Sequence, residues 1–137
     1  MSLFAMGNPL SNDCADILRQ TRPLWEDVRG KRIFITGGTG FFGCWLLESF
    51  IRANDQLDLN ASATVLTRNP EAFHRKAPHL AGHRSVTLHR GDVRTFTFPA
   101  GTFSHIIHAA TDSDADLQQA LPLLTFDSIV EGINALF

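Results

Sequence analysis

The sequence predicts an α/β fold in which helices cover both faces of a doubly wound parallel sheet. Two observations predict it. Short apolar runs rich in β-branched and aromatic residues alternate with stretches of helical spacing, and the first run leads directly into a glycine-rich turn that opens a helix. Short apolar strands that alternate with helices favour a parallel sheet buried on both faces. Right-handed crossovers then wind the chain onto both sides of that sheet.

Four segments have the composition expected of buried strands. The first is typical, because Ile33, Phe34 and Ile35 stand together in a short run that ends at Thr36. The β-branched and aromatic content of such runs favours strands, and their length is too short for a helix. The predicted strands cover residues 31–36, 63–67, 85–89 and 104–108.

Stretches with helical spacing separate these strands. A glycine-rich turn over residues 37–43 precedes the first helical stretch, and a polar connector over 54–60 follows that stretch. Pro70 suits the first position of a short helix, whereas Pro122 breaks or kinks the last one. The predicted helices of the main domain cover residues 44–53, 70–76 and 117–137.

The chain is expected to hold one domain preceded by an extension. Its 137 residues suffice for one domain with a core of useful size. Residues 1–28 are predicted to form an N-terminal extension, with a short helix over 14–20 whose length Pro23 limits. Residues 29–137 are predicted to form the main domain.

Composition excludes several classes of partner. The formal net charge of −2 provides no positive field for nucleic acid or for an anionic membrane surface. No apolar run reaches the ~18 residues that a membrane span needs, and the N-terminus lacks the pattern of a secretory signal. The two cysteines are too few for a disulfide scaffold, so we expect reduced thiols in a cytoplasmic protein.

The glycine-rich turn is the strongest local signal. It reads Thr-Gly-Gly-Thr-Gly-Phe-Phe-Gly over residues 36–43, between a predicted strand and a predicted helix. In such a turn small residues allow the backbone to approach a pyrophosphate, which binds the N–H groups at the start of the helix. The glycines fit both G-x-G-x-x-G and G-x-x-G-x-x-G. No Lys-Ser or Lys-Thr follows them, which excludes a P-loop.

These residues resemble the fingerprint of extended short-chain dehydrogenases/reductases, the NAD-dependent epimerase/dehydratase group. The resemblance runs from about residue 31 to residue 137 and does not cover residues 1–28. It implies a Rossmann fold in which the second spacing applies. The fingerprint glycines would then be Gly37, Gly40 and Gly43.

Two further segments are similar to motifs of that family. Asp92 and Val93 match its adenine-side Asp-Val/Leu motif, which implies that Asp92 accepts the adenine amino hydrogen and Val93 packs on the ring; a turn aspartate is the structural alternative. Ala109 and Ala110 match its Ala-Ala pair at the end of the fourth strand, with Thr111 beside the ribose or substrate. The predicted cofactor-binding residues are Gly37, Thr39, Gly40, Phe41, Phe42, Gly43, Thr67, Arg68, Asn69, Asp92, Val93, Ala109, Ala110 and Thr111.

The end of the second predicted strand favours NADP over NAD as the cofactor. An Asp or Glu about 20 residues past the glycines would bind the ribose hydroxyls of NAD. That strand ends at Thr67 without an acid, because Asp58 comes too early and Glu71 lies in the next helix. Arg68 follows instead, and a guanidinium suits a 2′-phosphate. The alternatives for Arg68 are stacking on adenine and a solvated loop charge.

The resemblance implies a nucleotide-sugar substrate and hydride transfer at a sugar hydroxyl in the full enzyme. The catalytic Ser/Thr and Tyr-x-x-x-Lys of the family would lie beyond Phe137. The chain contains no tyrosine, so no catalytic residue is assigned and we expect a fragment that is inactive alone. Two alternatives are a non-catalytic NADP-sensing regulatory module and an inactive structural fragment. The helix over 117–137 lies where the family often forms a homodimer.

Other groups of side chains give weaker indications of a functional site. His105 and His108 stand three apart on a predicted strand, so they face opposite sides and form no metal site. The helix dipole could lower the pKa of Cys44, but without a histidine partner a small packing residue is the better interpretation. Phe41 and Phe42 are adjacent, so at most one is expected to face the core.

Overall fold

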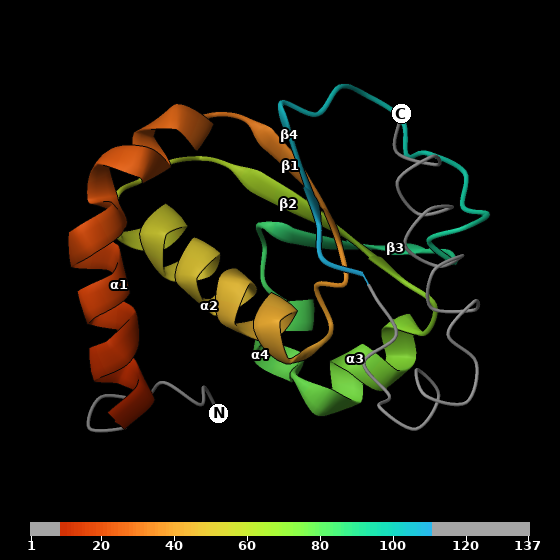
Figure 1. The fold of residues 1–137 in the computed structure, drawn as a ribbon, viewed down its shortest axis with the longest axis horizontal. Helices are drawn as coiled ribbons and strands as arrows, with labels where there is room; N and C mark the ends of the chain where they lie inside the picture. The colour runs from red at the N-terminus through yellow and green to blue at the C-terminus, as the bar shows by residue number, and fades with distance from the viewer. Residues whose placement is uncertain (1–8, 111–137) are drawn as a thin grey trace, which may run out of the picture.

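A computed structural model of the chain describes residues 9–110. Within them, four parallel strands form one sheet in the order β3-β2-β1-β4, flanked by helices (Figure 1). This order confirms the predicted α/β class, since the doubly wound Rossmann fold begins with the same arrangement. The elements are α1 (Pro9–Trp25), a 3-10 turn (Glu26–Val28), β1 (Arg32–Thr36), α2 (Phe41–Gln56), β2 (Ser62–Thr67), α3 (Pro70–Lys76), α4 (Pro78–Ala81), β3 (Val86–Arg90) and β4 (His105–His108).

β1 lies at the centre of the sheet, where the strand order reverses. In the ladders, Ile35 is paired with Val65 of β2 on one side and with Ile107 of β4 on the other. The chain steps outward from β1 to β2 and β3 and then returns to place β4 on the opposite side of β1. The carboxyl ends of β1 and β4 therefore meet at the topological switch point, where open α/β sheets bind ligands.

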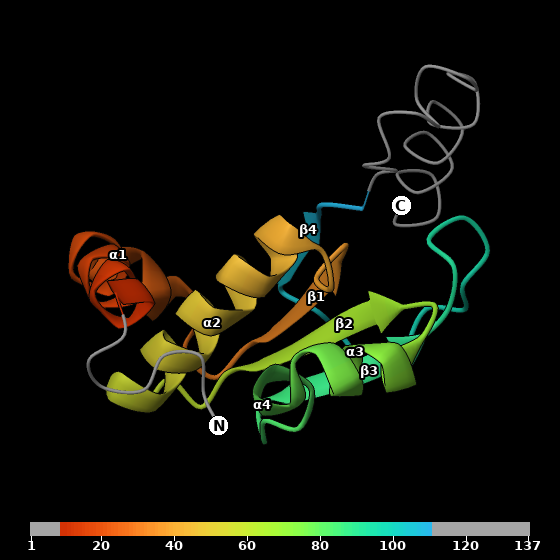
Figure 2. The ribbon, with the colours of Figure 1, turned by 90° about the horizontal axis from the view of Figure 1, so that it is seen from below.

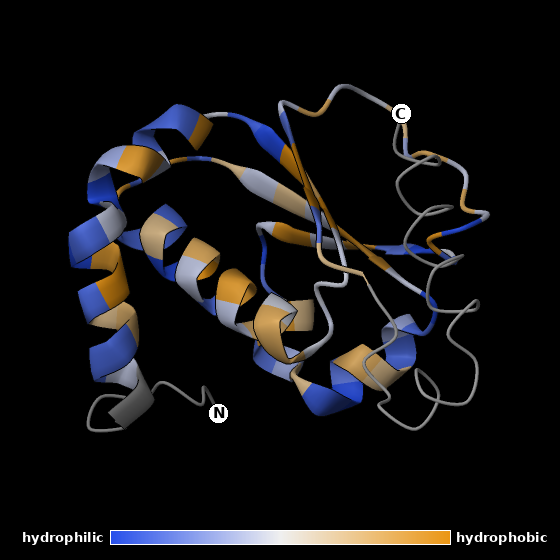
Figure 3. Ribbon diagram, in the orientation of Figure 1, coloured by the Kyte–Doolittle hydropathy of each residue, from blue (hydrophilic) through white to orange (hydrophobic). Residues whose placement is uncertain are grey.

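The main core lies between the sheet and its helices. Ile33 and Ile35 of β1 and Val65 of β2 pack with Leu47 and Phe50 of α2, and all five are buried. Figure 3 shows that the hydrophobic residues concentrate in the strands and on the sheet-facing side of α2. Burial of such side chains stabilises a fold by about 1.5–3 kcal/mol each. This packing fixes α2, and with it the turn that precedes α2.

An aromatic cluster covers the other face of the sheet. Phe34 of β1 is fully buried, and the rings of Phe96, Phe98 and Phe103 lie 4.8–5.5 Å from it, centroid to centroid. These three rings come from the segment between β3 and β4. The helix predicted over residues 117–137 lies outside the described residues.

The N-terminal helix is longer than predicted. α1 runs from Pro9 to Trp25, so the predicted boundaries of 14–20 were wrong, and Pro23 lies inside its last turn. The Thr21 hydroxyl donates to the carbonyl of Ile17 and accepts a hydrogen bond from the Trp25 indole N–H, which closes this end of the helix. In Figure 2, α1 lies beside α2, on the side away from the sheet. No helix of residues 9–110 is long and apolar enough to span a membrane.

The helices of the main domain also differ from the prediction. α2 begins at Phe41 and ends at Gln56, so it takes up part of the predicted turn and connector. The buried Asn54 belongs to this helix, because its side-chain oxygen accepts a hydrogen bond from the Ala61 N–H and so ties the helix end to the start of β2. α4 was not predicted; its His79 binds the carboxylate of Glu48 on α2.

Candidate functional site

The segment from the end of β1 to the first turn of α2 requires glycine at three positions, because the protein itself leaves no room there for a Cβ. Gly37 has a φ of +73°, and a Cβ there would lie 2.4 Å from the carbonyl carbon of Ala109. A Cβ on Gly38 would lie 2.7 Å from Val65, and one on Gly43 would lie 2.3 Å from the oxygen of Gly37. The turn is therefore packed tightly against β2, β4 and the first turn of α2.

Gly40 differs from the other glycines of the turn. Its φ of −78° suits any residue, and among residues 9–110 a Cβ there would meet only the oxygen of Gly37, at 3.5 Å. Gly40 is exposed and lines a cavity, so a side chain would project into open space. The fold itself does not require glycine here, whereas a ligand that approaches the backbone would.

The start of α2 presents backbone donors to this cavity. The first intrahelical hydrogen bond runs from the Cys44 N–H to the Gly40 carbonyl, and no side chain of the described part of the chain caps the helix. The N–H groups of Phe41, Phe42 and Gly43 precede that bond, in the positions where a helix lacks internal acceptors. Together with the helix dipole they favour an anion. Both phenylalanine side chains are exposed, at 83% and 68%, in agreement with the prediction that at most one faces the core.

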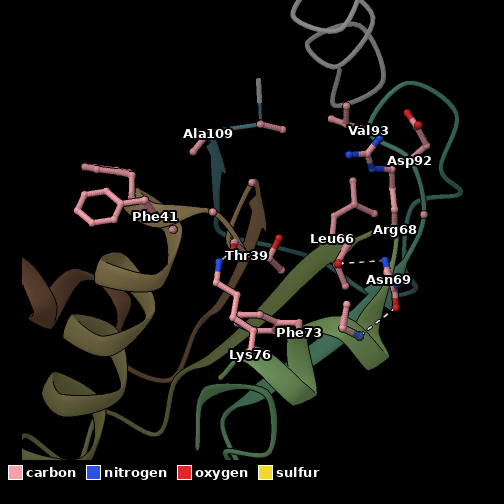
Figure 4. Close-up of a pocket in the computed structure, with 18 of the residues that line it drawn as sticks. Thr39, Phe41, Leu66, Arg68, Asn69, Phe73, Lys76, Asp92, Val93 and Ala109 are labelled. Atoms are coloured by element: carbon pink, nitrogen blue, oxygen red, sulfur yellow. Dashed lines mark hydrogen bonds between the residues drawn. The ribbon is translucent and has the colours of Figure 1, made fainter. Parts of the chain in front are cut away.

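The cavity has a volume of about 770 Å3 and lies along the carboxyl edge of the sheet (Figure 4). This volume is within the range typical of small-molecule and cofactor sites, ~300–1,000 Å3. All predicted cofactor-binding residues among those described line it, and Thr111 lies outside the described residues. Residues that the sequence prediction missed also line it: Leu66, Ala72, Phe73, Lys76, Gly91 and Arg94.

Two side chains at the end of β2 hold the turn that carries Arg68. The Asn69 side-chain oxygen accepts a hydrogen bond from the Ala72 N–H and caps α3, while the Asn69 N–H donates to the Thr67 hydroxyl. Between them Arg68 is exposed, and its guanidinium lies beside Val93 in Figure 4. This guanidinium makes no hydrogen bond or ion pair with any residue in the described part of the chain.

Both carboxylates near this turn are already paired with arginines. Asp92 accepts hydrogen bonds from the backbone N–H and the guanidinium of Arg94, at 2.9–3.2 Å, which hold the pKa of its carboxyl below the ordinary value. Glu71 of α3 binds Arg90 of β3. The Asp92 carboxylate is therefore ionised and can accept hydrogen bonds, but the Arg94 guanidinium already binds both of its oxygens. Its predicted contact with adenine stays a prediction.

The wall of the cavity at the switch point consists of small residues after β4. Ala109 and Ala110 line the cavity, and the Ala109 N–H donates to the Thr36 carbonyl. The Thr36 hydroxyl and His108 Nδ1 lie 2.6 Å apart, which joins the ends of β1 and β4. Burial lowers the pKa of His108, which favours the neutral form of its ring. Ala109 and Ala110 therefore line the cavity with small, uncharged side chains where the two strands end.

Cys44 is a packing residue in this structure. Burial raises the pKa of its thiol, and the thiol lies 3.7 Å from the Thr39 carbonyl, to which it donates. Its burial therefore favours the neutral thiol over a reactive thiolate. Among the described residues, no three His, Cys, Asp or Glu side chains gather closely enough to hold a metal ion.

The fold and the site define a Rossmann-type domain with a dinucleotide-sized cavity above its glycine turn. The chain matches the NAD-dependent epimerase/dehydratase family over residues 33–137, and it belongs to that family. It is accordingly an NAD(P)-binding domain of the oxidoreductase type, with a nicotinamide dinucleotide as its partner. The search of curated proteins found no match to the chain.

Proposed function

We propose that this domain binds NADP(H), in preference to NAD(H), for an oxidoreductase that acts on a nucleotide sugar in the cytoplasm. The observation that carries the binding proposal is Gly40, which lines the cavity although neither its φ nor its neighbours require glycine. A Cβ at this position would fill the space that a pyrophosphate needs at the start of α2. The cradle therefore fits the cofactor of the family.

Each wall of the cavity has a separate task in this proposal. The N–H groups at the start of α2 bind the pyrophosphate. Val93 packs on the adenine, and Ala109 and Ala110 leave room for the dinucleotide to cross the switch point. The bound cofactor supplies the hydride chemistry, and the protein orients it and excludes water.

The preference for NADP rests on the charges around the end of β2. Arg68 occupies the place where an acid would bind the ribose hydroxyls of NAD, and both nearby carboxylates are paired with arginines. A hydroxyl gains little from a guanidinium, whereas a 2′-phosphate gains a charge-assisted hydrogen bond. This electrostatic difference favours the phosphorylated dinucleotide.

Arg68→Ala is expected to weaken NADPH binding by about 10- to 100-fold and NADH binding by less than about threefold, since hydrogen bonds to charged groups contribute ~1.5–3 kcal/mol. Isothermal titration calorimetry with both dinucleotides measures the two losses. Arg75→Ala removes the same charge from an exposed position outside the cavity and is the control. Equal losses for NADPH and NADH in the Arg68 variant would reject the 2′-phosphate role.

The nucleotide-sugar proposal is supported by membership of the family, which combines epimerases and dehydratases. We propose that such a sugar binds beside Ala110, where the nicotinamide end of a dinucleotide would lie. UDP-, dTDP- and GDP-hexoses titrated into the NADPH-saturated protein test it by calorimetry. Heat of binding with one of them supports the proposal, and none with any of the three contradicts it for this domain.

A further inference from the structure

A second cavity lies at the opposite end of the sheet from the cavity above the glycine turn. It has a volume of about 570 Å3 and is lined by the segments that lead into β2 and β3. The arrows of these two strands in Figure 1 point away from this end, because the strands are parallel and both begin here. Its lining is almost entirely polar and includes Asn54, Asn60 and Ser85. None of its lining residues belongs to the first cavity.

Ser85 ends a chain of hydrogen-bonded side chains that reaches this cavity. Its Oγ lies 2.8 Å from Nδ1 of His83, and Nε2 of His83 lies 3.2 Å from a carboxylate oxygen of Asp55. His83 and Ser85 stand just before β3, whereas Asp55 comes from the last turn of α2, 28 positions away from His83. A hydroxyl, an imidazole and a carboxylate are therefore connected in that order.

A backbone group fixes the direction of this chain. The Ser85 N–H donates a hydrogen bond to Nδ1 of His83 over 3.2 Å. Nδ1 is therefore the nitrogen without a proton, and Nε2 carries the proton and donates it to Asp55. Because Nδ1 can only accept, the Ser85 hydroxyl donates to it. An imidazole that accepts from a hydroxyl is placed to act as its general base.

The carboxylate of this chain is held in position from a second side. Arg84 donates to the other oxygen of Asp55 over 3.2 Å, so the carboxylate is fixed in its orientation toward the His83 ring. His79 offers a comparison, because it also binds a carboxylate, that of Glu48. No hydroxyl in residues 9–110 completes that pair, so the full arrangement occurs only at Ser85 within the described part of the chain.

We propose that Ser85 is the nucleophile of a second, hydrolytic site that takes short acyl esters. Its Oγ attacks the acyl carbon, and the hydroxyl proton passes to Nδ1 of His83. The bond from the acyl carbon to the alcohol oxygen breaks, and the alcohol leaves with that proton. Water then cleaves the acyl group from Ser85 by the same proton transfer, first to and then from Nδ1. Asp55 stabilises the imidazolium that forms in each step.

The cavity suits a short and polar acyl ester. Its volume is that of a small-molecule site, and its polar lining disfavours a long apolar chain. The side-chain oxygen of Asn54 already accepts from the Ala61 N–H, so the amide group of Asn54 has its N–H donors left for an acyl oxygen. The serine binds Nδ1 and the carboxylate Nε2, the reverse of the serine hydrolases, and either nitrogen can accept a proton.

The test is the reaction of the full 137-residue chain with p-nitrophenyl acetate and with diisopropyl fluorophosphate. The protein is expected to hydrolyse the ester, and peptide mass mapping should find the diisopropylphosphoryl group on Ser85. Ser85→Ala should lose both reactions. His83→Gln keeps a hydrogen-bonding side chain without a base and should lower the rate by about 100-fold or more. Asp55→Asn should lower it by about 10-fold or more.

Ser62→Ala is the matched control, because Ser62 lines the same cavity but makes no hydrogen bond with a histidine of residues 9–110. It should react like the unmodified protein, and denaturation curves show whether each variant is folded. An unmodified protein that leaves Ser85 unlabelled, or a folded His83→Gln protein with an unchanged rate, overturns the proposal. NADPH affinity should be the same in Ser85→Ala, so failure of the hydrolytic site leaves the proposed dinucleotide binding untouched.

Discussion

Gly37→Ala is expected to destabilise the domain by about 2–5 kcal/mol. The left-handed backbone costs roughly 1–2 kcal/mol for a residue with a Cβ, and overpacking typically adds about 1–3 kcal/mol. Here the Cβ would lie 2.4–2.5 Å from the backbone of Ala109 and Ala110, where no side chain can move aside. The total is a large part of the ~5–15 kcal/mol that stabilises a typical domain.

Urea denaturation followed by circular dichroism measures this loss, and Gly30→Ala provides the matched control. Gly30 has a similar φ of +69°, but no atom lies within 4 Å of its ideal Cβ. It should therefore show the backbone cost alone. Equal free energies of unfolding for the two variants would contradict the close contact between the turn and the end of β4.

Gly40→Ala is expected to abolish most dinucleotide binding while the domain remains folded. The φ of −78° accepts alanine, and the loss of glycine at the start of a helix costs at most about 1 kcal/mol. A methyl group in the path of the pyrophosphate should weaken both NADPH and NADH by about 100-fold or more, because the helix amides then lie beyond hydrogen-bond distance.

Calorimetry and a denaturation curve on the same sample test this pair of effects. Gly82→Ala is the control, since Gly82 follows α4 with a φ of −94° and does not line the cavity. It should leave both affinities unchanged. A Gly40 variant that binds NADPH as well as the unmodified protein would remove the main support for a pyrophosphate at this turn.

The sequence was sufficient to predict the class of fold and to predict which residues after each strand line the cavity. Short apolar runs located all four strands to within one residue at each end, because buried parallel strands have a composition of their own. The cofactor prediction at Arg68 used its place after the second strand and its charge, and the prediction at Val93 used its place after the third strand and a resemblance to a family motif. In a parallel sheet, segments after successive strands meet at one edge, so this order carries spatial information.

Features that depend on packing could not be predicted in the same way. α1 continues through Pro23 because local hydrogen bonds from Thr21 and Trp25 support its last turn. The contact of Lys76 with Thr39 spans 37 positions in the sequence and depends on the direction of α3. No local pattern encodes such a direction, so this contact became visible only in the structure.

The contact between β1 and β4 also has a consequence for the order in which the strands associate as the protein is synthesised. β1 meets β4 through Thr36 and His108, 72 positions apart, whereas a much shorter segment, which contains α2, connects β1 to β2. During synthesis on a ribosome, the first three strands can associate before the fourth has emerged. The edge that lines the cavity would then form only once β4 has paired with β1, and a bound dinucleotide would hold β4 in place by mass action.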